Sequence, residues 1–175
     1  PGRKALRRAG RTKNGKIDIS AAAEAAAAQR GEATQMARPE EIYAALAAMA
    51  PTALAESWDN VGLLVDTGAD VTSVLVTLDI TEEVAAEAEL AGCQLIVSHH
   101  PDIYGGLKSL NRRDVAFRLV KKNISAVCMH TNLDAAQGGV NDVLAALFDV
   151  RDAQPFAEGC GRVGGVDVAH VAVDV

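Results

Sequence analysis

The sequence predicts an α/β protein built from βαβ units around a largely parallel sheet. Three short runs of apolar, mostly β-branched residues alternate with helical patterns of about ten residues, the order that such units produce. The runs are continuously apolar rather than alternating, as expected for parallel strands covered on both faces. We therefore expect one α/β domain, preceded by a segment of different composition.

The change in composition falls near residue 36. Residues 1–35 are interpreted as a basic and alanine-rich extension or linker, because residues 1–30 hold eight Lys or Arg against two acidic residues. The remaining residues are acidic, and the whole chain has a formal net charge of −6. An acidic body, and a basic segment without a recognisable motif, argue against nucleic acid as the main partner. Residues 36–175 are expected to form the α/β domain.

Length and composition set further bounds. A chain of 175 residues with 49% apolar content suits one domain with a real core. No run reaches the roughly 18 apolar residues of a membrane span, and no signal peptide is visible. The three cysteines, Cys93, Cys128 and Cys160, lie too far apart for a zinc pair or a disulfide framework. These features predict a cytoplasmic protein with reduced, mostly buried thiols and no membrane contact.

The elements of the domain can be placed in chain order. The first helix begins near Pro39, which suits a first helical turn, and ends at Pro51. The second helix has Thr81 as its N-cap and Gly92 at its C-terminal end. We expect strands over residues 74–78, 95–97 and 124–129, and helices over residues 81–90, 114–122 and 140–148.

Polar residues gather where the three predicted strands end. The first strand runs into Asp79, the second into Ser98–Pro101 and the third into His130–Asp134. In open α/β sheets, ligands bind beyond the carboxyl ends of the strands. Three of the four histidines in the chain are therefore expected at one functional edge of the sheet.

Imidazole and carboxylate groups in this position predict a divalent metal site for zinc, iron, manganese, cobalt or nickel. The candidate ligands are His99, His100 and Asp134. A bend at Pro101 would let the adjacent histidines serve neighbouring ions, and two ions would lower the pKa of a bridging water. Structural alternatives stay open: the two histidines can form a surface turn, and Asp134 can cap a helix.

Other polar residues near these strand ends have structural interpretations. We expect His130 to bond a backbone carbonyl and orient its loop, and Asp79 to cap a strand end or orient a ligand histidine. Residues 58–60, Trp-Asp-Asn, are interpreted as a turn with a packed aromatic side chain. The glycine pairs at 105–106 and 138–139 are loop glycines, because the chain has no GxxxxGK[ST] pattern.

Three motifs together resemble the Nif-three-like family, which is also named GTP cyclohydrolase 1 type 2. They are SWDNVGL at residues 57–63, VSHHP at 97–101, and HTNLDAA at 130–136 with GGVND at 138–142. The resemblance extends from about Arg38 to about Gly164. It implies a mixed α/β fold, a homohexameric ring, and a dinuclear site with His99, His100 and Asp134 as ligands.

The same resemblance implies a metal-dependent hydrolase whose small-molecule substrate would be GTP, with no catalytic residue assigned. The alternatives are a non-enzymatic metal-binding or protein-interaction module, and a nucleic-acid adaptor acting through residues 3–16. In the family a His and a Glu four residues later complete the site. Here His170 and Asp174 have that separation but follow Asp134 too soon, so only the N-terminal half of the family fold is expected.

Overall fold

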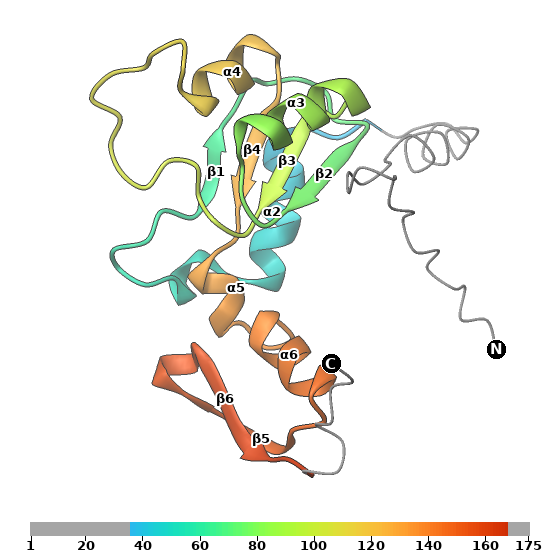
Figure 1. Ribbon diagram of the computed structural model, residues 1–175, viewed down its shortest axis with the longest axis vertical. Coiled ribbons are helices and arrows are strands. Elements are labelled where there is room, and N and C mark those ends of the chain that lie inside the picture. Colours follow the sequence, from blue (N-terminus) through green and yellow to red (C-terminus); the bar gives the residue numbers. More distant parts are fainter. Residues whose placement is uncertain (1–35, 168–175) are drawn as a thin grey trace, which may run out of the picture. The chain divides into compact units, whose positions relative to one another are not determined.

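The computed structural model describes residues 36–167 (Figure 1). The extension expected over residues 1–35 and the pair His170 and Asp174 lie outside the described residues. The helices are α2 (Pro39–Met49), α3 (Glu82–Ala91), α4 (Val115–Lys121), α5 (Thr131–Ala135) and α6 (Val140–Leu147), with 3-10 turns η1 (Thr52–Leu54) and η2 (Ala157–Gly159). The strands are β1 (Gly62–Val65), β2 (Val74–Thr77), β3 (Leu95–Ser98), β4 (Ser125–Cys128), β5 (Arg151–Phe156) and β6 (Gly161–Gly165).

The main sheet has four strands in the order β1-β4-β3-β2. The three strands predicted from the sequence, β2, β3 and β4, pair in parallel. Strand β1 was not predicted, and it pairs antiparallel with β4, with Gly62 opposite Cys128. The predicted α/β class and largely parallel sheet are therefore confirmed, with one antiparallel edge strand added.

The ends of α3 show how the sequence fixes an element locally. The Thr81 hydroxyl accepts a hydrogen bond from the Val84 backbone N–H at 3.2 Å, which caps the helix at its start. Gly92 adopts φ +67°, a left-handed conformation that glycine reaches without strain, and it ends the helix. Strand β3 begins three residues later, so this cap sets the direction in which the chain returns to the sheet.

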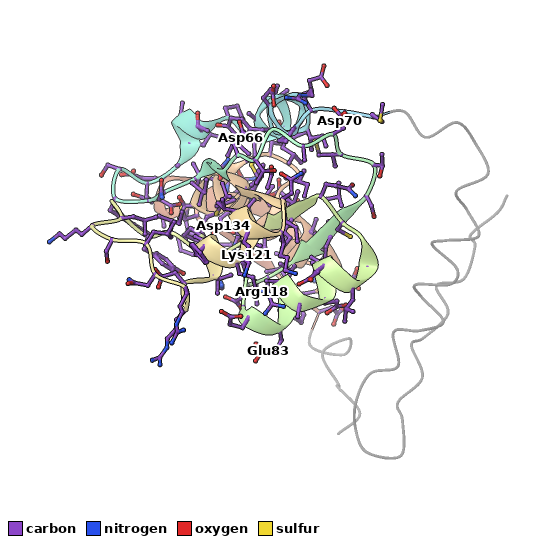
Figure 2. All side chains as sticks on the ribbon, turned by 90° about the horizontal axis from the view of Figure 1, so that it is seen from above. Asp66, Asp70, Glu83, Arg118, Lys121 and Asp134 are labelled. Carbon is purple, nitrogen blue, oxygen red and sulfur yellow. The ribbon has the colours of Figure 1, made fainter. Side chains whose placement is uncertain are left out.

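Helices cover both faces of the main sheet. Seen from above, Figure 2 shows α2 on one side of the strands and α3 on the other. Ile96 of β3 packs with Ala85 and Leu119 under α3 and α4, and all three side chains are buried. Leu95 and Val127 point the other way and pack under α2. Successive strand residues alternate between faces, so each strand contributes to both cores.

A second, two-stranded sheet follows α6. Strands β5 and β6 pair antiparallel around η2, and most of their residues are exposed. Arg162 of β6 forms an ion pair with Asp142 of α6, which joins the hairpin to that helix. Among residues 36–167, no helix has the length and apolar character needed to cross a membrane.

Candidate metal centre

Three histidine side chains converge at the carboxyl edge of the main sheet. His99 and His100 follow β3, and His130 follows β4, its parallel neighbour. Their ring centroids are 5.1 to 5.4 Å apart. One ring nitrogen of each histidine lies within 4.8 Å of the others, which is close enough for the three rings to share a metal site. We call His99, His100 and His130 the histidine cluster.

The backbone holds the His99–His100 turn in place. The His99 N–H donates to the Thr77 carbonyl at 3.2 Å, and the His100 N–H donates to the Leu78 carbonyl at 2.8 Å. The Cys128 thiol donates to the His99 carbonyl at 3.1 Å. The turn is therefore attached to the strands on both sides of β3, which limits how far the two rings can move.

His99 is oriented by the backbone. Its Nδ1 lies 3.1 Å from the Met129 carbonyl oxygen. A carbonyl oxygen can only accept a hydrogen bond, so Nδ1 carries the proton and Nε2 keeps its lone pair in the neutral ring. The Nε2 atom lies 3.6 Å from the Asp134 carboxylate, inside the site.

His100 is oriented by a carboxylate. Its Nδ1 lies 2.7 Å from Oδ1 of Asp79, the residue that follows the end of β2. The sequence predicts that Asp79 caps the strand or orients a histidine, and in the structure it contacts His100, whose role as a ligand stays a prediction. This pair is the most exposed of the three histidine anchors, because about half of the Asp79 side chain is open to solvent.

His130 is held by a buried carboxylate. Its Nδ1 lies 2.9 Å from Oδ1 of Asp59, whose side chain is 1% exposed. Asp59 also accepts hydrogen bonds from the Asn60 N–H at 2.8 Å and from the N–H and hydroxyl of Thr131. Burial alone would raise the pKa of Asp59, but the hydrogen bonds from Thr131, His130 and Asn60 outweigh it and lower that pKa. Asp59 is therefore an anion beneath the cluster at neutral pH.

The contacts that hold the three histidine rings have one consequence in common. In each ring of the histidine cluster, Nδ1 faces an acceptor, and Nε2 makes no hydrogen bond to any of residues 36–167. Metal-ligating histidines usually show this arrangement, because the second-shell acceptor fixes the ring and makes the other nitrogen more basic. The donor set therefore fits a divalent ion bound through Nε2 atoms.

Asp134 reaches the site because α5 turns the chain immediately after β4. The Asp134 N–H donates to the His130 carbonyl at 3.1 Å, so the carboxylate lies one helical turn beyond His130. The fully buried Asn132 supports this turn, accepting from the His130 N–H at 2.9 Å and donating to the Ala50 carbonyl at 2.7 Å. The three predicted ligands, His99, His100 and Asp134, therefore lie at one site.

The cysteines are free, as predicted. Cys128 lies directly under the site, where burial raises the pKa of its thiol to about 12. A metal would have to displace a tightly held proton to bind this sulfur, and its hydrogen bond to the His99 carbonyl would be lost. Cys128 therefore supports the turn rather than supplying a ligand.

Asp102 lies just after the His99–His100 turn and has a carboxyl group without a partner in the described part of the chain. Both carboxyl oxygens are buried, and among the described residues they have no hydrogen-bond partner. Burial raises the pKa of this carboxyl. An unsatisfied buried carboxylate destabilises a fold at neutral pH, so Asp102 marks a strained point next to the histidine cluster.

Two assignments made from the sequence need revision. The Nδ1 atom of His130 contacts the Asp59 carboxylate and not a backbone carbonyl, and the ring lies within the histidine cluster. The Trp-Asp-Asn turn does not bury its aromatic residue, because Trp58 is 65% exposed and meets His130 edge-on. The side chain of that turn that is buried belongs to Asp59, which sequence reasoning had not placed in the site. The available signal in the sequence was the run of side chains with polar groups at residues 58–60, just before the short apolar run at residues 61–65.

Comparison with known proteins gives consistent matches. A family model described as Duf34/NIF3 (NGG1p interacting factor 3) matches residues 37–174. A Staphylococcus aureus protein named "GTP cyclohydrolase 1 type 2 homolog" is 43% identical over 106 residues, which cover 58% of this chain and 29% of the relative. A Lactococcus lactis protein of the same name is 37% identical over 130 residues, covering 70% of this chain and 51% of the relative.

The same group is found among solved structures. A Bacillus cereus protein described as related to NIF3 superposes with a TM-score of 0.64 at 33% identity, covering 69% of this chain and 35% of that protein. The chain thus spans about a third to a half of the length of the proteins that it resembles.

Proposed function

The chain belongs to the Duf34/NIF3 family, and from that premise we propose that it binds divalent metal ions and acts as a metal-dependent hydrolase. One observation carries the proposal: in each ring of the histidine cluster Nδ1 faces an acceptor, while Nε2 has no hydrogen-bond partner in the part of the chain that the structure describes. Metal-ligating histidines usually have this arrangement, whereas a surface turn does not need it in three separate side chains.

The chain's own residues would divide the work as follows. His99, His100 and His130 would hold an ion through Nε2, and Asp134 would bind a second ion or bridge the two. Met129, Asp79 and Asp59 would keep the rings in their orientations. A divalent zinc, iron, manganese, cobalt or nickel ion, when bound, supplies Lewis acidity and makes water a better nucleophile at neutral pH.

The substrate is a small molecule in this proposal, and GTP is the first to test. The support is the printed name of the curated relatives, "GTP cyclohydrolase 1 type 2 homolog". Hydrolytic attack by water at C8 of the guanine would open the imidazole ring of that base, so the reaction can be followed by ultraviolet absorbance. We also propose a cytoplasmic homo-oligomer, a hexamer by family resemblance. Tight metal binding with no turnover of any substrate would favour the alternative, a metal-binding interaction module.

A double substitution tests the metal site. Replacing His99 and His100 by Ala removes two Nε2 ligands from a turn outside the sheet, so metal content should fall to background while circular dichroism stays unchanged. Metal is measured by elemental analysis after dialysis. The matched control is Cys93→Ser, which changes a potential ligand two residues before the start of the same strand, β3. Equal metal content in wild type and double variant would overturn the proposal.

A further inference from the structure

A cavity of about 630 Å³ opens beside the histidine cluster on the α2 face of the main sheet. Side chains of α2 line one wall, including Leu46 and Met49, and Val74, Val76 and Leu78 line the other. Ten of the thirteen lining residues are apolar and none is Asp, Glu, Lys or Arg. A volume between roughly 300 and 1,000 Å³ is typical of small-molecule pockets, so the cavity is large enough for a ligand.

The cavity exists because α2 covers only part of its face. Helix α2 packs on Leu95 and Val127, over the middle of the sheet. At the edge, alternate residues of β2 and the residue after it, Val74, Val76 and Leu78, point to this face and remain 40%, 78% and 58% exposed. No helix among the described residues covers that half of the face, although its side chains are as apolar as those of a core.

The cavity is continuous with the metal centre. His99 and Met129 both line it, and they are the residues joined by the bond between the ring Nδ1 and the backbone carbonyl. Leu133 of α5 also lines it, one residue before Asp134. A molecule whose polar end is held at the histidine cluster can therefore place its next atoms against the apolar walls.

We propose that the site takes small molecules with a metal-binding oxygen or nitrogen head group attached to an apolar chain or ring, and that this cavity holds the apolar part. The inference rests on the proposed metal-dependent function and specifies its substrate class. It disfavours a triphosphate in the cavity itself, because no Lys or Arg is present there to pair with phosphate oxygens.

Alkyl hydroxamates test the inference, because they join a metal-binding head group to a chain of chosen length. The full chain is loaded with zinc or manganese and titrated calorimetrically with acetohydroxamate, butyrohydroxamate, hexanohydroxamate and octanohydroxamate. Affinity should rise about threefold to fourfold for each added methylene, the equivalent of roughly 0.8 kcal/mol. Affinity independent of chain length, in protein that holds metal and binds acetohydroxamate, would overturn this inference alone.

A charge placed in the cavity provides the matched variant. Val76→Glu changes a side chain that is 78% exposed, so the fold should tolerate it, and metal content reports that the metal centre is intact. The increase with chain length should disappear. Leu90→Glu, an 84% exposed apolar residue of α3 that does not line the cavity, should keep it.

Two further outcomes separate the possible failures. Protein that holds no metal under any loading condition would refute the proposed function, whatever the cavity does. The second outcome is a metal-loaded protein that is a dimer in light scattering and becomes a monomer in the Val76→Glu variant. If neither protein shows an effect of ligand chain length, a second copy occupies this face. That result would overturn the small-molecule inference.

Discussion

The two faces of the main sheet are built from similar apolar residues but are closed to different degrees. On the α3–α4 face, Ile96 and Leu119 are fully buried, and small residues such as Ala85 and Ala88 let the helices approach the strands. Arg118 of α4 reaches Glu82 and Glu89 of α3, joining the two helices over that core. Figure 2 shows Arg118 and Glu83 on this side of the sheet.

The α2 face is less completely covered than the α3–α4 face. Leu95 and Val127 are fully buried there, but Met49 and Val76 remain 72% and 78% exposed. The histidine cluster lies at the edge of this less covered face, since His99 lines its cavity. The difference indicates that the closed face carries stability, while the open face and the adjoining strand ends are available for a ligand.

The largest effect is expected from Leu119→Ala on the closed face. Leu119 is fully buried in a core of mostly small side chains, which cannot easily move to fill the space. The free energy of unfolding should fall by about 2 to 5 kcal/mol. Urea denaturation followed by circular dichroism measures it. A loss no greater than that of a surface substitution would show that this face is not the stable one.

Asp59→Ala should give the next largest effect. The substitution leaves His130, Thr131 and Asn60 without their acceptor, and the free energy of unfolding should fall by about 1 to 3 kcal/mol. Asp59→Asn, which keeps the size of the side chain, serves as the conservative control and should lose less.

The Asp59 effect should also depend on pH. Its pKa is lowered by folding, so its contribution is complete above the ordinary Asp value and disappears as pH falls through the folded pKa. The difference between wild type and Asp59→Ala should be constant from about pH 5 to 8 and should shrink below about pH 4. A difference that grows with acid would contradict the assignment of Asp59 as a buried anion.

Asp102→Asn should have a smaller effect of the opposite sign. Asp102 is a buried carboxyl with no partner among the described residues, so its charge opposes folding at neutral pH. Burial raises its pKa, and the penalty is therefore greatest above the folded pKa and is relieved as pH falls. The variant should be more stable than wild type by about 1 kcal/mol at pH 7, with the advantage lost near pH 4. Thermal melts at the two pH values test this, and a less stable variant at pH 7 would indicate that the carboxylate has a partner in solution.

Val76→Thr on the open face should have the smallest effect. The two side chains are similar in shape, and this one is already 78% exposed, so the free energy of unfolding should change by less than about 0.5 kcal/mol. The measurement is the urea denaturation used for Leu119→Ala. A loss comparable with that of Leu119→Ala would mean that Val76 is buried in solution and that the two faces do not differ.

The sequence predicted the parallel part of the sheet because its signals are local. Residues 74–78 and 95–97 are continuous apolar runs, and Thr81 and Gly92 are caps that act within a few residues. Strand β1 is as long as the predicted strands, but its pairing with β4 brings together positions such as Gly62 and Cys128. A contact between residues so far apart in the chain leaves no periodic signal near either of them.

The candidate site was likewise predictable from the sequence only in part. His99, His100 and Asp134 could be named because strand ends of a parallel sheet meet at one edge, and their role as ligands stays a prediction. The part played by Asp59 could not be named, because its bond to His130 joins residues 71 positions apart. Likewise, α5 is a single helical turn whose first residue, Thr131, is fixed by that same distant carboxylate.

The central claim is that the Nε2 atoms of the histidine cluster form a divalent metal site. The most direct measurement is anomalous diffraction, at the zinc and manganese absorption edges, from crystals grown with each ion. The account predicts a peak at the cluster about 2.0 to 2.2 Å from Nε2 of His99, His100 or His130, with Nδ1 still bonded as described. A second peak beside Asp134 would support a dinuclear site. The absence of a peak at the cluster in crystals grown with either ion would contradict the account. Histidine rings turned so that Nε2 bonds to protein atoms would also contradict it.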